Sequence, residues 1–300
     1  MQRIGIYLFS FAMTLGGYAA RAAGDTKAAE LLAQARAAIG GDSKVSKVQG
    51  LEASGALQRA LGDRQIGGDV TLAIQLPDKF LRTDSISPMG DGALIVTEQG
   101  VNGEKVLRNS KTLNTGPGMM IRMPPPPAPG SEAEMQLLRN SRAELARLTV
   151  AMLLTSPASV PLEFVYSGEA EAPEGKADVI DVKGTGGFAA KLFLDKSTHR
   201  PLMLAYRGVA PRMVVQTQRG DGPSTVPRPA PGAEPGHGTP TAPPAEQVDI
   251  NMFLDDYKSV DGMMLPHHIT RSIGGEPNEE WTFKTIKVNP AFKPDTFTQK

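Results

Sequence analysis

Two pairs of adjacent acidic residues are the clearest candidates for acid–base chemistry in this sequence. Asp255-Asp256 and Glu279-Glu280 both lie near turn signals in strand-like segments. Neighbouring residues of a strand point to opposite faces, so we expect each pair to belong to a solvated rim. The alternative is the carboxylate dyad of a hydrolase, in which two carboxyl groups flank one bond.

The four histidines do not have the spacing of a metal site. His237 falls in a Pro- and Gly-rich segment, and His199 falls in a turn. His267 and His268 are adjacent in a predicted strand, so their rings diverge and cannot bind one metal ion together. The sequence also lacks the HExxH, GxSxG and P-loop patterns, and Gly-rich residues 184–187 join two strands without opening a helix. We therefore predict no catalytic residue, no metal and no cofactor.

One arginine and two aromatic residues remain as candidates for ligand contact. Trp281 and Phe283 share one face of a predicted strand, where they form either core or a platform for a ligand. Arg82 follows Phe80 on an earlier strand. An arginine at such a position is ordinarily exposed or ion-paired, whereas one that points inward could gate a cavity.

Composition indicates an exported protein without cysteine chemistry. Residues 1–22 combine a basic start, an apolar stretch and a small-x-small site, which predicts a secretory signal peptide. The alternative is a membrane anchor, but the apolar run is shorter than the roughly 20 residues that a span needs. The lack of cysteine excludes disulfides, thiolate metal sites and lipidation on cysteine, so we expect a soluble mature protein.

The charge balance argues against a nucleic-acid partner. The chain has 32 basic and 32 acidic residues, which gives no broad attraction to nucleic acid or to anionic lipid surfaces.

The elements that position these candidates are predicted to be long antiparallel strands and two helices. A helix at 26–39 ends at a Gly pair, and a second helix begins after Ser131, with Glu134 placed for a capping box. Short turns join the strands, so that local pairing builds one sheet. The predicted strands are 48–61, 65–76, 79–86, 93–98, 105–109, 161–168, 177–183, 189–195, 200–206, 213–218, 248–254, 264–273 and 280–288.

Two segments are predicted to lie outside this regular structure, in a single domain at 23–300. The Pro/Met-rich loop at 113–130 has four consecutive prolines. It is either a surface loop whose methionines pack on the sheet edge or a mobile lid over an apolar cavity. The Pro/Gly-rich residues 219–245 have few large apolar side chains and are predicted to be a disordered insertion.

The order of several loose motifs resembles the LolA-like superfamily of periplasmic outer-membrane lipoprotein-sorting proteins. The motifs are LPDKFLR at 76–82, ALIVTEQGVNGEKVLR at 93–108, FLDKSTHRPLMLAY at 193–206, DDYKSVDGMMLPHHITRS at 255–272 and VNPAFKPDTFT at 288–298. The resemblance implies an α+β, mainly antiparallel fold, in which a curved incomplete β-barrel of about eleven strands wraps over two or three helices. It also implies a periplasmic location and an apolar cavity for acyl chains.

We therefore expect a non-catalytic periplasmic carrier or sensor that binds lipid or lipoprotein acyl chains. The alternative is an envelope interaction module that binds a membrane-protein partner without lipid transport. Apolar side chains from the sheet, the Pro/Met-rich loop and the second helix are expected to line the cavity. They are Leu72, Ile74, Phe80, Met119, Met120, Met123, Leu145, Leu148, Trp281 and Phe283, with Arg82 as a polar gating residue.

Overall fold

The computed structural model describes residues 19–62, 64–87, 94–113, 127–172, 175–209 and 247–299. Most of the predicted signal peptide and of the Pro/Met-rich loop, and all of the strand predicted at 213–218 and the insertion at 219–245, lie outside these residues. The described residues form one twelve-stranded antiparallel sheet and three α-helices. The expected fold class is thereby confirmed, with one strand more than the resemblance implied.

The strands form where apolar and polar residues alternate. In the last strand Trp281 and Phe283 are buried, while Thr282 between them is exposed. The strand bounds are β1 Gly50–Leu61, β2 Arg64–Gln75, β3 Lys79–Ile86, β4 Leu94–Asn102, β5 Lys105–Leu113, β6 Leu162–Ala172, β7 Gly175–Gly184, β8 Ala189–Asp195, β9 Pro201–Val209, β10 Gln247–Val260, β11 Met263–Ile273 and β12 Glu276–Val288. A short 3₁₀ turn, η1 Thr185–Gly187, joins β7 to β8, as expected for that Gly-rich segment.

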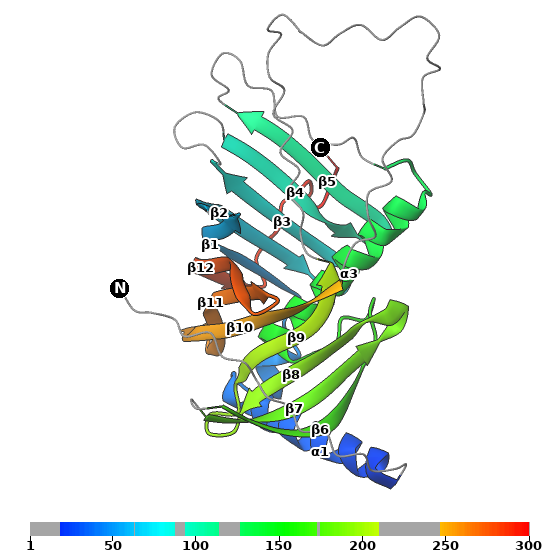
Figure 1. The fold of residues 1–300 in the computed structure, drawn as a ribbon, viewed down its shortest axis with the longest axis vertical. Coiled ribbons are helices and arrows are strands. Elements are labelled where there is room, and N and C mark those ends of the chain that lie inside the picture. The colour runs from blue at the N-terminus through cyan, green and yellow to red at the C-terminus, as the bar shows by residue number, and fades with distance from the viewer. Residues whose placement is uncertain are drawn as a thin grey trace, which may run out of the picture.

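The order of the strands explains why a helix crosses the sheet. The order is β5-β4-β3-β2-β1-β12-β11-β10-β9-β8-β7-β6, so β1 pairs with β12, and β5 and β6 stand at opposite edges. The connection from β5 to β6 contains α3 (Glu132–Leu153), whose 22 residues span about 33 Å at 1.5 Å per residue. Figure 1 shows α3 crossing the middle of the sheet. It contacts β3, β4 and β5 on one side and β9 on the other.

Ser131 and Leu154 set the two ends of α3. The Ser131 hydroxyl accepts a hydrogen bond from the Glu134 N–H at 3.2 Å, as the capping-box prediction requires. The Glu134 carboxylate differs from that prediction, because it accepts from the Gly130 N–H at 2.6 Å. At the other end Leu154 has φ 53° and ψ 35°, a left-handed conformation that stops the helix.

The N-terminal helix α1 (Ala19–Ala38) begins earlier than the predicted residue 26, and α2 (Asp42–Val45) is a single turn behind it. α1 lies at the β6 end of the sheet (Figure 1). One stripe of this helix is apolar, and every member of the stripe is buried. These residues are Ala28, Leu31, Leu32, Ala35 and, just after the helix, Ile39.

The helices cover one face of the sheet, which we call the helix-covered face. The main core lies there, between α1, α3 and the inward side chains of the strands. On the opposite face Phe292 and Phe297 of the C-terminal tail pack with Leu81 and Leu107. In the part of the chain that the structure describes, no helix is both long enough and apolar enough to cross a membrane.

Candidate functional site

The apolar side chains predicted to line a cavity lie together in the core of the helix-covered face. The described ones are Leu72, Ile74, Phe80, Leu145, Leu148, Trp281 and Phe283, and none is more than 2% exposed. The rings of Trp281 and Phe283 are 6.1 Å apart at a tilt of 53°. Met119, Met120 and Met123 fall outside the described residues. Side chains of α3 pack against the sheet at this place, so a ligand that entered here would have to displace α3.

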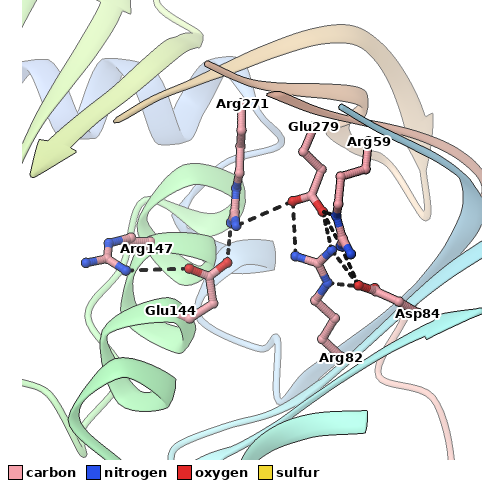
Figure 2. A network of polar contacts seen from close by, with 7 residues as sticks. All are labelled: Arg59, Arg82, Asp84, Glu144, Arg147, Arg271 and Glu279. Carbon is pink, nitrogen blue, oxygen red and sulfur yellow. Dashed lines mark hydrogen bonds and ion pairs between the residues drawn. The ribbon is translucent and has the colours of Figure 1, made fainter. Parts of the chain in front are cut away.

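Seven charged residues interrupt this apolar face (Figure 2). We call Arg59, Arg82, Asp84 and Glu279 the sheet cluster, because β1, β3 and β12 carry them. We call Glu144, Arg147 and Arg271 the helix cluster, because α3 carries the first two and β11 carries the third. Burying charge is unfavourable unless each group finds partners, so the contacts decide what this network can do.

Strand register brings the sheet cluster together. Arg59 on β1 and Arg271 on β11 are both direct cross-strand partners of Glu279 on β12. Strand β2 lies between β1 and β3, and its residue Gly68 is on the same face of the sheet as the cluster. Gly68 has no side chain that could come between the charged residues of β1 and those of β3. A β-carbon on Gly68 would lie 2.2 Å from the carbonyl oxygen of Ser85, so β3 approaches β2 too closely for any other residue.

Each carboxylate of the sheet cluster accepts hydrogen bonds from two arginines. Arg82 donates from Nε and Nη2 to the two oxygens of Asp84 at 2.7 and 2.8 Å, and from Nη1 to Glu279 at 3.1 Å. Arg59 Nη2 donates to Asp84 at 2.6 Å and to Glu279 at 2.5 Å. Two arginines thus balance two carboxylates, with the bidentate geometry that makes such pairs strong.

The helix cluster connects α3 to the sheet. Arg271 Nη2 donates a hydrogen bond to Glu144 Oε1, and Arg147 Nη1 lies 3.5 Å from Glu144 Oε2. Arg271 Nη1 also lies 3.9 Å from Glu279 Oε2, which links the two clusters. Here two arginines face one carboxylate of their own cluster, so the helix cluster carries a formal charge of 2 − 1 = +1.

The two clusters also differ in exposure. The side chains of Arg82, Asp84 and Glu279 are 5% to 7% exposed, whereas those of the helix cluster are 12% to 17% exposed. Arg59 is the exception in the sheet cluster at 19%, because it borders a surface hollow. The excess positive charge therefore lies in the cluster in which every member is partly exposed.

The surface hollow beside the sheet cluster is polar and small. It holds about 30 Å³, which is room for one or two water molecules and not for a lipid. Its lining residues are Gln58, Arg59, Ala60, Gln65, Thr270, Pro277, Asn278, Glu279 and Glu280.

Aromatic rings complete the surroundings of the arginines. The guanidinium carbons of Arg82 and Arg271 lie 4.7 and 4.4 Å from the centre of the Trp281 ring, and that of Arg147 lies 3.9 Å from the Tyr206 ring. Among the described residues, Trp281 Nε1, Arg271 Nε and Arg147 Nε are buried without a hydrogen-bond partner. The helix cluster therefore keeps unused donors, although both of its arginines are already paired.

Burial and charge act in opposite directions on the pKa values of these groups. Burial alone would raise the pKa of Glu279, but the charges of Arg82 and Arg59 outweigh burial and hold it well below its usual range. Burial would also raise the pKa of Glu144, yet the charge of Arg271 leads to a net lowering. For Arg82 and Arg271 burial would lower the pKa, and the neighbouring carboxylates raise it. All four groups are therefore ionised at neutral pH.

The two acid pairs do not form a carboxylate dyad. Glu280 points away from Glu279, and its Oε1 lies 2.9 Å from His268 Nε2. The expectation of a solvated rim is wrong for Glu279, because the arginines on both neighbouring strands hold it inside the sheet cluster. That expectation is confirmed for Asp255 and Asp256, which are exposed. Ion-paired carboxylates with lowered pKa values are suited to holding charge and poorly suited to proton transfer at neutral pH.

The remaining predicted positions are placed as follows. Arg82 points inward and is ion-paired, while its gating role stays a prediction. His267 is buried, with Nδ1 3.0 Å from the Leu265 carbonyl oxygen. Within the described ranges, no group of three or more His, Asp or Glu side chains could hold a metal ion.

Sequence analysis did not single out five members of the network. They are Arg59, Asp84, Glu144, Arg147 and Arg271. The sequence did contain a signal for the members that lie on strands. Asp84 and Arg271 each follow an apolar or aromatic residue by two or four positions, which places them on the same face of the strand as that residue. Charges in phase with a buried face predict pairing, but they do not reveal the partner strand.

Comparisons with known proteins give distant structural similarities. No family model and no curated protein matches it. A LolA superfamily protein from Nitrosomonas europaea is 9% identical with a TM-score of 0.46, over 91% of this chain and 97% of its own. A DUF1329 family protein from Desulfovibrio piger is 9% identical with a TM-score of 0.48, over 90% and 96%. A domain described as an outer membrane lipoprotein-sorting protein from Vibrio parahaemolyticus is 10% identical with a TM-score of 0.44, over 91% and 97%.

Proposed function

We propose that this protein is a non-catalytic periplasmic carrier or sensor that binds lipid or lipoprotein acyl chains between α3 and the helix-covered face of the sheet. The observation that carries the proposal is the nature of that contact. One side of an unclosed sheet presents a large apolar surface around the seven charged residues, and helices cover it instead of a second sheet. A helix that moves away would expose an apolar trough suited to a flexible chain.

The uneven burial of α3 supports such a movement. Its N-terminal half is largely exposed, with Met135 at 44%, while residues 145–153 at its C-terminal end, apart from Arg147, are buried. Polar contacts attach the middle of the helix to the sheet and to the β4–β5 turn. Arg142 donates to the Gly103 carbonyl at 3.1 Å and pairs with Glu104, and Glu144 pairs with Arg271.

A chemical bridge between α3 and the β4–β5 turn tests the proposal. The chain contains no cysteine, so the double variant E104C/R142C can be closed with a short bis-maleimide without side reactions at other thiols. The bridge holds α3 on the sheet. The same variant capped at each cysteine with a monofunctional maleimide is the matched control, because it has the same substitutions and no tether.

Uptake of a fluorescent fatty acid and native mass spectrometry of lipid-loaded protein are the measurements. The capped variant is expected to take up ligand as the unmodified protein does, and the bridged variant is expected to lose uptake. Equal uptake by both forms would exclude binding beneath α3. A protein that binds no amphiphile in any form, yet retains an envelope membrane protein in a pull-down, would favour the interaction module.

A further inference from the structure

We propose that Arg271 receives the anionic headgroup of the bound amphiphile, and that the Glu144 carboxylate occupies the headgroup position while the protein is empty. The ligand class is a long apolar chain that ends in a carboxylate or phosphate. This inference rests on the proposed function, because it needs α3 to move away from the sheet.

The first step of the argument is the fate of each charge when α3 moves. Glu144 and Arg147 lie one turn apart on the same helix, 3.5 Å apart, so they leave together as a neutral pair. Arg271 belongs to β11 and stays with the sheet. After α3 has moved away, the excess charge of +1 in the helix cluster is therefore the charge of Arg271.

The second step is that the sheet cluster does not offer Arg271 a replacement partner of equal quality. Glu279 already accepts hydrogen bonds from Arg59 and Arg82, and its closest approach to Arg271 is 3.9 Å. Arg271 would keep its place over Trp281, without the carboxylate that balanced its charge. An incoming anion that pairs with Arg271 through charge-assisted hydrogen bonds would replace the interaction that Glu144 provides.

The third step concerns geometry. A guanidinium presents a planar fork of N–H donors that matches the oxygens of a carboxylate or a phosphate. Arg271 uses Nη2 on Glu144, and its buried Nε has no partner among the described residues. A headgroup that replaces Glu144 can thus accept hydrogen bonds from two donors of Arg271: Nη2, which donates to Glu144 in the empty protein, and Nε, which Glu144 leaves free. An uncharged headgroup cannot replace the lost carboxylate, which makes the site selective for anions.

Binding of three amphiphiles with the same chain tests this inference: laurate, dodecyl phosphate and dodecanol. Each is titrated against the full-length protein by displacement of a fluorescent probe. The unmodified protein is expected to prefer both anions over the alcohol by at least about tenfold, as a charge-assisted pair implies. In R271Q the preference is expected to vanish while dodecanol still binds. In E144Q the affinity for laurate is expected to rise, because the competing carboxylate is absent.

Two further variants keep the test decisive. The double variant E144Q/R271Q removes both partners, so it shows the loss of preference even where R271Q alone folds poorly. R207Q removes an arginine whose side chain is 68% exposed on β9 and is expected to leave the preference unchanged. Equal affinity for all three amphiphiles would overturn the inference and leave the proposed function standing, whereas binding of none would overturn both. An unchanged laurate affinity in E144Q would overturn the role given to Glu144.

Discussion

The sheet cluster and the helix cluster are built from the same kinds of side chain, yet they hold the fold in different ways. In the sheet cluster each carboxylate is shared by two arginines, every member lies on a strand, and the charges cancel. In the helix cluster a single carboxylate, that of Glu144, pairs with two arginines. It lies on α3, which packs against the sheet and is not part of it. The same kinds of side chain therefore join strands with balanced charge in one place and join a helix to the sheet with excess positive charge in the other.

The largest effect is expected from neutralising the centre of the sheet cluster. E279Q leaves Arg59 and Arg82 without one of their two acids, so it should lower the free energy of unfolding by about 3 to 5 kcal/mol. E144Q acts at a somewhat more exposed site, where Arg271 still has Glu279 within 3.9 Å, and should cost less, about 1 to 2 kcal/mol. Urea unfolding of both variants measures the contrast. Equal losses would remove the distinction between the clusters, and E280Q, beside Glu279 on the other face, is the control.

A smaller effect is expected from G68A. The added β-carbon would meet the Ser85 carbonyl oxygen at 2.2 Å, so β3 must shift away from β2 and carry Arg82 and Asp84 with it. Overpacking of this kind costs about 1 to 3 kcal/mol. Thermal unfolding measures the loss, with G67A as the control, because nothing lies within 4 Å of a β-carbon there. If G68A is as stable as G67A, the close approach of the strands does not support the sheet cluster.

Acid is expected to weaken both clusters through their glutamates. The pKa values of Glu279 and Glu144 are lowered in the folded protein by the arginines that outweigh the effect of burial. Their contribution to stability is therefore complete above the ordinary carboxyl pKa and is lost as the pH falls through the lowered values. Unfolding measured between about pH 6 and pH 3 should show stability that declines with acidification. The decline should be shallower in E279Q, and an unchanged slope in that variant would contradict the assignment.

The smallest effect is expected at the start of α3. S131A removes the hydroxyl that accepts a hydrogen bond from the Glu134 N–H and should cost about 1 kcal/mol. Amide hydrogen exchange should rise in the exposed half of α3 and remain unchanged in β12. Faster exchange in β12 would mean that the sheet cluster depends on the helix after all.

The fold was accessible from the sequence because its signals are local. Alternation of apolar and polar residues around Trp281 and the left-handed turns at glycine pairs depend on neighbours along the chain. The Ser131 cap was found in the same way, although the Glu134 side chain was assigned to the wrong N–H. The network was not accessible, because its partners are far apart in sequence. Arg59 and Glu279 are 220 residues apart and meet only through the pairing of β1 with β12.

The error at Glu279 has the same origin. Adjacent acids beside a turn favour a solvated rim, and that inference holds for Asp255 and Asp256. Local sequence does not show that arginines from β1 and β11 face Glu279 on both sides. Burial of charge is decided by such non-local pairing, so the sequence predicts which face a residue occupies better than it predicts which charge it meets.

The pairing of β1 with β12 has a consequence for the order of assembly during folding. Strands β1 to β5 can pair with their sequence neighbours early, but the free side of β1 has no partner until β12 reaches it. Leu51 and Val288, which face each other across that seam, are 288 − 51 = 237 positions apart. Contacts of such long separation form slowly, so the folding chain exposes an open strand edge until β12 joins β1. We expect chaperones that shield unpaired strands to bind the folding chain at this edge and to be released when β12 joins the sheet.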